Sequence, residues 1–132
     1  MNAELAIIEI LLADSTVSGI VGAEVHLDEV TQGKPLPFIV VEESDVEPND
    51  SRDGASAVDY GRVRVFCYHT NKADLRTLAL ASRNAIEGKA AGTYRTVNFD
   101  HARFISESSF SEEIENRPAY AKDQEYVVRV IR

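Results

Sequence analysis

The sequence predicts an α+β fold: a mixed or antiparallel sheet, two main helices packed on one face of it, and a long C-terminal β-hairpin. Residues 58–70 alternate between the two faces of a strand and are rich in β-branched and aromatic residues. Residues 71–88 follow with apolar residues at helical spacing, and residues 120–131 alternate again. A long strand that leads into an amphipathic helix supplies both a sheet and a cover for it.

The composition fits one domain that spans residues 1–132. Hydrophobic residues make up 44%, enough for a single packed core, and no apolar run reaches the roughly 20 residues that cross a bilayer. No basic region precedes the first apolar stretch, which contains Glu4, so we expect no signal peptide. Cys67 is the single cysteine and cannot form an internal disulfide, which fits a reducing cytoplasm.

The net charge of −8 argues against specific or general nucleic-acid binding, because affinity for phosphates comes mainly from clustered Lys and Arg. Arg62 and Arg64 are the only pair that could form a basic strip. An acidic protein can also be one that must not retain DNA that passes close to it.

The first helix is expected over residues 3–13, where Leu5, Ile8 and Leu12 form one stripe and Ile7 and Leu11 widen it. Such a helix is covered on more than one side. Either it is a core helix of the monomer, or its extra apolar side meets another subunit. A short second helical turn follows, capped by Asp14 or Ser15.

Two strands come next, over residues 25–28 and 38–43, with a turn over residues 31–37 between them. Residues 38–41 are apolar on both faces, which predicts a strand covered on both sides. Residues 44–57 are almost entirely polar, so we expect a mobile loop there. That loop is either a solvated connector or a segment that orders against a partner.

The central strand places its side chains on two faces: Val63, Val65 and Cys67 on one, and Arg62, Arg64, Phe66 and Tyr68 on the other. The helix after it begins with Asn71 as its N-cap and Asp74 in its first turn, and it stops at Gly88. Its small and apolar stripe consists of Leu75, Leu78, Ala79, Ser82 and Ile86.

The C-terminal part is expected to contain strands over residues 94–98, 102–110 and 120–131, with an acidic turn over residues 112–118. Strict alternation places Ile105 on one face and both Phe104 and Phe110 on the other. The last two strands are long, so we expect a hairpin that projects past the core or one that bends at a bulge.

Residues with catalytic or metal-binding chemistry are present but are not arranged for a reaction. His26 with Asp28, and Cys67 with His69, are pairs that share a strand face, whereas a zinc site needs three or four convergent ligands. His101 has no such neighbour. No nucleophile motif or phosphate-binding glycine loop occurs, so we expect no enzyme activity, no metal and no cofactor.

The order of these elements resembles the tail-completion, or tail-terminator, minor tail proteins of long-tailed bacteriophages and prophages. The resemblance covers nearly the whole chain and rests on a pattern of apolar and turn residues. The segments that carry it are Gly19-Ile20-Val21-Gly22, Val25-His26-Leu27-Asp28-Glu29, the turn Gly33-Lys34-Pro35-Leu36-Pro37 leading into Phe38-Ile39-Val40-Val41, Gly61-Arg62-Val63-Arg64-Val65-Phe66-Cys67-Tyr68, the helix from Ala73-Asp74-Leu75 to Ala85-Ile86-Glu87-Gly88, and Glu125-Tyr126-Val127-Val128-Arg129-Val130.

The resemblance implies a structural protein of the virion that is present in the host cytoplasm before assembly. Its place would be the head-proximal end of the tail, where a homo-hexameric ring, possible also as a free monomer, would contact the tail tube protein and the head-completion protein. It would end tail polymerisation and provide the surface for head joining. No enzyme activity, cofactor or membrane is implied.

We expect the subunit or partner interface in the loop over residues 45–57, in the hairpin region over residues 108–120 and in part of the first helix. Its candidate residues are Asp45, Glu47, Asp50, Arg52, Asp53, Phe110, Glu112, Glu113, Arg117 and Tyr120. Two alternatives stay open: a head–tail connector or neck protein, and a metal-dependent hydrolase that uses the acidic cluster at residues 42–53.

Overall fold

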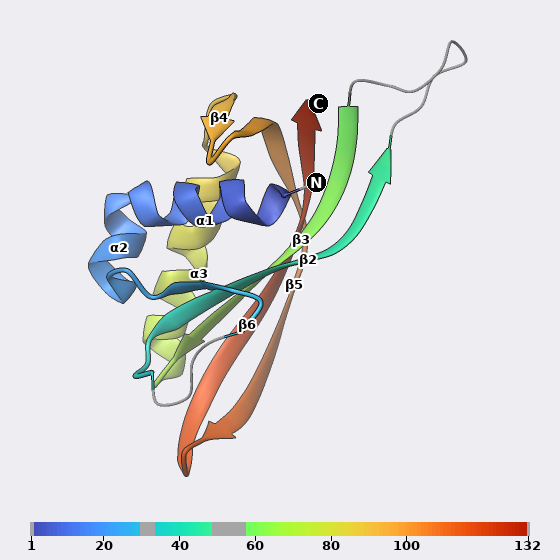
Figure 1. Ribbon diagram of the computed structural model, residues 1–132. Helices are drawn as coiled ribbons and strands as arrows, with labels where there is room; N and C mark the ends of the chain where they lie inside the picture. Colours follow the sequence, from blue (N-terminus) through green and yellow to red (C-terminus); the bar gives the residue numbers. More distant parts are fainter. Residues whose placement is uncertain (1, 30–33, 49–57, 132) are drawn as a thin grey trace.

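A computed structural model describes residues 2–29, 34–48 and 58–131 of the chain (Figure 1). Its three helices lie on one side of a six-stranded sheet that is strongly curled (Figure 1). In chain order the elements are α1 (Ala3–Ala13), α2 (Ser15–Val21), β1 (Val25–Leu27), β2 (Phe38–Pro48), β3 (Val58–His69), α3 (Lys72–Glu87), β4 (Gly92–Tyr94), β5 (Val97–Ile114) and β6 (Arg117–Ile131).

The strand order in the sheet is β1-β2-β3-β6-β5-β4. The β1–β2 pair is parallel and every other pair is antiparallel, so the sheet is mixed. The α+β class is therefore confirmed. The curl of the sheet was not predicted, and the short second helical turn expected after the first helix is the helix α2. Among the described residues, none of the helices is both long enough and apolar enough to cross a membrane.

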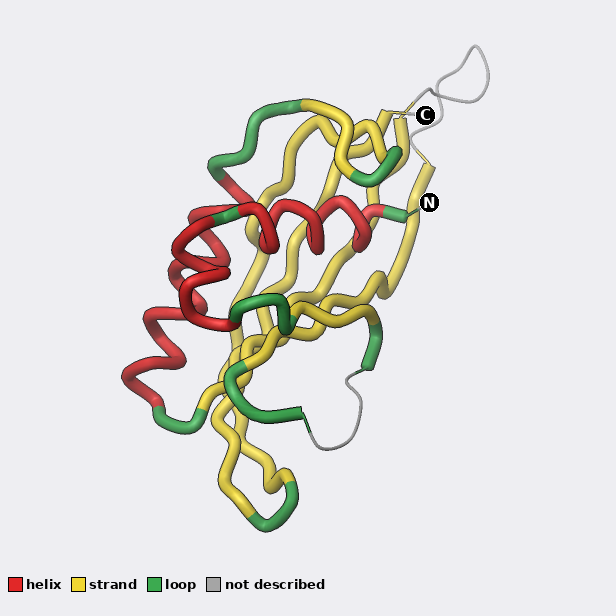
Figure 2. Tube along the Cα trace, turned by 60° about the vertical axis from the view of Figure 1, so that its left-hand side comes forward, coloured by secondary structure: helices red, strands yellow, loops and turns green. Residues whose placement is uncertain are grey.

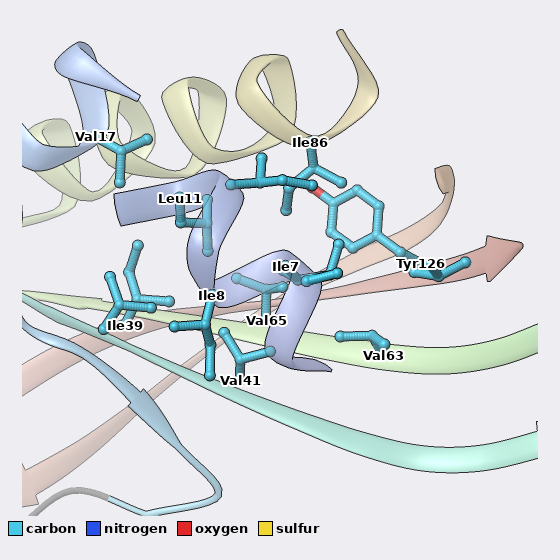
Figure 3. Packing of buried hydrophobic residues seen from close by; sticks show 14 of the residues in the cluster. Ile7, Ile8, Leu11, Val17, Ile39, Val41, Val63, Val65, Ile86 and Tyr126 are labelled. Atoms are coloured by element: carbon cyan, nitrogen blue, oxygen red, sulfur yellow. The ribbon is translucent and has the colours of Figure 1, made fainter. Parts of the chain in front are cut away.

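Helix α1 is buried by its own chain on more than one side. Ile7, Ile8, Ile10 and Leu11 are all at most 3% exposed. The helix contacts α2, α3 and strands from β1 to β5, so the core-helix interpretation accounts for its two apolar sides (Figure 3). Asp14 ends α1 and caps α2, because its Oδ1 accepts hydrogen bonds of 3.0 Å from the N–H groups of Thr16 and Val17.

Helix α3 closes the core from the same side of the sheet (Figure 3). The N-cap is confirmed, since Asn71 Oδ1 accepts a 2.8 Å hydrogen bond from the N–H of Asp74. All five residues of the predicted stripe are buried. Ser82 lies against Cys67, with 3.6 Å between Oγ and Sγ, and both side chains are fully buried.

A polar chain of hydrogen bonds crosses the core between α3 and the hairpin. Gln124 is fully buried, and its Nε2 donates to the carbonyl of Ala79 at 2.9 Å and to Glu107 Oε1 at 3.0 Å. Its Oε1 accepts from the hydroxyl of Tyr126 at 2.9 Å. The amide nitrogen and the amide oxygen of Gln124 thus both have hydrogen-bond partners, as buried polar groups require.

Three predicted element boundaries are wrong. Residues 44–48 belong to β2 rather than to a loop, because they pair with β3 after a bulge at Ser44. The acidic segment stays in β5 as far as Ile114, and only Glu115 and Asn116, both with positive φ, form the turn. The strand expected over residues 94–98 is interrupted by a second tight turn, at Arg95 and Thr96, which joins β4 to β5.

The prediction that Phe104 and Phe110 share a face is also wrong. Ile105 is an extra residue in β5, because Phe104 pairs with Tyr126 and Ser106 pairs with Glu125. A bulge of one residue exchanges the two faces for every later side chain. Phe104 therefore packs on the helix side, against Tyr126, whereas Phe110 packs on the opposite side of the sheet.

Candidate assembly surface

The long β5–β6 hairpin is the feature that stands out from the rest of the molecule. It continues past the helices and ends well away from them (Figures 1 and 2). Residues 105–113 of β5 are all exposed. Beyond its pairing with β4, which ends at Phe99, the outer edge of β5 has no neighbouring strand among the described residues. A long strand with an open edge is a ready site for contact with another chain.

The base of this hairpin is held by a row of aromatic side chains on the face of the sheet that is away from the helices. Phe38, Tyr68, Ala121 and Phe110 occupy one register row across β2, β3, β6 and β5. The ring centroids of Phe38 and Tyr68 are 4.9 Å apart, and those of Tyr68 and Phe110 are 6.1 Å apart. These contacts also explain why residues 38–41 are buried on both sides, as the sequence predicts.

Ion pairs follow the aromatic row along the same face. Arg64 pairs with Asp123, which is only 8% exposed, and Arg62 NH1 lies 3.0 Å from Glu125 Oε1. Arg129 pairs with Asp100 farther along, and this contact holds the pKa of the Asp100 carboxyl below its ordinary value. Arg62 and Arg64 were the only residues expected to form a basic strip that could bind phosphates. In the structure both form ion pairs with carboxylates of β6.

The structure divides the predicted interface residues into two groups. Asp45 and Glu47 are exposed on β2 and pair in register with Arg62 and Tyr60. The hairpin group contains Phe110, Glu112, Glu113, Arg117 and Tyr120, of which all but Tyr120 are exposed. Asp50, Arg52 and Asp53 lie outside the described residues.

These two groups do not meet within one molecule. Phe38 pairs with Tyr68 at the hairpin end of the sheet, whereas Glu47 pairs with Tyr60 toward the other end. The nine residue steps from Phe38 to Glu47 correspond to about 30 Å of extended strand. If both groups make contacts, each contacts a different neighbour.

Sequence reasoning missed a basic groove between α3 and the hairpin. It consists of two adjoining hollows of about 220 and 320 Å³, which share Arg76 and Lys122 in their walls. The cations that line it are Lys72, Arg76, Arg83 and Lys122, and its only carboxylate among the described residues is Glu107. The spacing of three of these cations on one helix was the available signal, but their approach to β6 depends on the tertiary fold.

The titratable residues are placed for packing and pairing. Burial raises the pKa of the Cys67 thiol to about 12, so the thiol is not a nucleophile near neutral pH. His26 Nε2 lies 2.7 Å from Glu24 Oε2, and this hydrogen bond lowers the pKa of Glu24. Within the described part of the chain, no three His, Cys, Asp or Glu residues gather where they could hold a metal ion.

The exposed hairpin, the open strand edge and the basic groove are the features of a protein that contacts other proteins. The chain belongs to the family described as "Tail completion protein gp17", which matches residues 5–110. It is therefore a structural protein of phage tails, from a family that is not a known enzyme family.

A solved structure described as "Virion of native gene transfer agent (GTA) particle" contains a chain with the same fold. The two chains are 23% identical and superpose with a TM-score of 0.70, over 96% of this chain and 92% of the other. No curated protein sequence matches this chain.

Proposed function

We propose that this protein caps the phage tail tube, ends its polymerisation and offers the surface to which the head is joined. In this role it acts at the head-proximal end of the tail as a closed ring, for which a hexamer is our expectation. Its partners are other copies of itself, the tail tube protein and the head-completion protein.

The observation that carries this proposal is the β5–β6 hairpin of a tail completion protein, which exposes residues 105–113 and continues past the helices (Figure 1). A ring needs two unlike surfaces on each subunit that meet head to tail. The chain offers such surfaces at opposite ends of its sheet, at Glu47 and at the hairpin. The likeness of its fold to a chain in a virion supports a place in a phage-like particle.

The net charge of −8 supports a position around a DNA channel. A lumen lined by carboxylates repels the phosphate backbone, so DNA passes without being retained. Where the acidic residues face outward instead, they offer contacts for basic partners.

Deletion of the gene, followed by electron microscopy of the lysate, tests this function. The expected result is filled heads beside tails that are unjoined and longer than normal, with both defects corrected by the intact gene in trans. Filled heads beside unjoined tails of normal length would contradict the capping role and favour a connector or neck protein. Normal, infectious particles would contradict both.

A further inference from the structure

We propose that the basic groove between α3 and the hairpin receives the acidic hairpin tip of a second copy of this chain. We define the acidic tip as Glu112, Glu113 and Glu115, and the basic groove as the hollow lined by Lys72, Arg76, Arg83 and Lys122. The inference rests on the proposed ring and names the contact that would close it.

The groove is positive in a protein that is otherwise strongly acidic. Four cations and one carboxylate line it, although the chain as a whole carries a charge of −8. Glu107 is already engaged there, since its Oε2 lies 3.5 Å from Lys122 Nζ and its Oε1 accepts from Gln124. Lys72 and Arg76 take part in none of the ion pairs among the described residues. Arg83 pairs with Glu87, with 2.5 Å between Nε and Oε1, so the uncompensated positive charge of the groove is that of Lys72 and Arg76.

The groove also contains apolar side chains. Leu80 is 60% exposed, and the Tyr120 ring lies beside Lys72, whose Nζ is 5.6 Å from the ring centroid. Exposed apolar side chains among unpaired cations are typical of a protein interface rather than of a solvated surface. The chemistry that fits is an extended acidic segment that includes an apolar residue.

The acidic tip has that chemistry. Three carboxylates flank Ile114, the tip carries a single cation, Arg117, and none of the three glutamates takes part in an ion pair among the described residues. Glu113 and Ser109 lie on the same face of β5, and Ser109 lines the groove. The four residue steps from Ser109 to Glu113 span about 13 Å of extended strand, so the tip points away from its own groove. Only another copy can bring the two surfaces together.

The test uses two engineered cysteines, because Cys67 is fully buried and leaves the surface free of thiols in the described residues. The double variant Glu113→Cys/Arg76→Cys is expressed in trans in a gene-deletion background, and the assembled tails are oxidised. The expected result is a ladder of disulfide-linked multimers of this chain. The matched control, Glu47→Cys/Arg76→Cys, is expected to yield about tenfold less cross-linked product, because Glu47 lies at the other end of the sheet.

A ladder that forms only with Glu47→Cys would overturn the assignment, since the groove would then receive β2 of the neighbour. Complete tails with no ladder from either variant would overturn it as well. Where the variants prevent assembly, a carbodiimide applied to unaltered tails joins a Lys72 or Lys122 amine directly to a Glu113 or Glu115 carboxyl. Mass spectrometry of that linked peptide supports the contact, and its absence beside other linked peptides of this chain contradicts it.

Failure of this contact is distinguishable from failure of the proposed function. Tails of normal length that are joined to heads, but that show no link between tip and groove, would leave the capping role in place and remove the groove as its contact. A deletion that leaves tail length and head joining unchanged would remove the capping role. The cross-link would still report whether two copies meet.

Discussion

The ring of Phe110 on β5 meets the ring of Tyr68 on β3 edge to face, with centroids 6.1 Å apart, although strand β6 lies between them. The small side chain of Ala121 occupies the position between them on β6 and is fully buried under the two rings. This row joins the projecting hairpin to the sheet. It sets the direction in which the hairpin leaves the body of the protein.

The substitution Phe110→Ala is expected to lower the free energy of unfolding by about 1–2 kcal/mol, because the ring is partly exposed and its loss removes two aromatic contacts. Hydrogen exchange should also become faster in the hairpin before it changes in α1. The control Ser108→Ala, one row along on the same face, should change the stability by less than about 0.5 kcal/mol. Equal effects of the two substitutions would show that the aromatic row does not hold the hairpin.

Two ion pairs of the same face, Arg64–Asp123 and Arg62–Glu125, should differ in strength. Arg64→Ala leaves the carboxylate of Asp123 almost buried without its cation, which should cost about 1–3 kcal/mol in chemical denaturation. Arg62→Ala removes an exposed partner of Glu125 and should cost less than about 1 kcal/mol. A larger loss for Arg62→Ala than for Arg64→Ala would contradict this order.

The carboxyl group of Glu43 should make the protein less stable as the pH rises. Burial, together with the neighbouring Glu4 carboxyl, raises the pKa of Glu43 from 4.5 to about 7 in the folded protein. Between these two values the folded state binds more protons than the unfolded state, so stability falls as the pH increases from about 4.5 to about 7.

The variant Glu43→Gln should remove this pH dependence and raise the melting temperature at pH 8 by a few degrees. Thermal melts from pH 4 to pH 8 measure the effect. The variant keeps an oxygen that can accept from the N–H of Ala3, which donates to Glu43 at 3.2 Å in the native protein. Parallel melting curves for the two proteins over this range would rule out the role of Glu43.

The thiol of Cys67 should report unfolding. Its burial and its pKa of about 12 predict almost no reaction with a disulfide reagent at pH 8 in the native protein. In denaturant the thiol should react completely within the mixing time. A fast reaction without denaturant would mean that α3 separates readily from β3, since Ser82 of α3 covers the sulfur.

The sequence alone predicted the elements that depend on periodicity and on local capping. The alternation in β3 and β6, the buried stripe of α3 and its Asn71 cap are all present, because each follows from contacts within a few residues. The assignment to tail completion proteins also came from the order of these elements and is confirmed. The candidate interface at residues 45–53 and 110–120 stays a prediction.

Only the tertiary structure decided where the faces of β5 lie and what surrounds them. Strict alternation fails at Ile105, because a bulge there shifts the pairing of β5 with β6, and a bulge is a feature of strand pairing rather than of the residue itself. Likewise, Lys72 and Arg76 of α3 form a groove with Lys122 only because antiparallel pairing returns β6 beneath that helix. Periodicity determines which residues share a face of one element, whereas long-range pairing determines which elements share a surface.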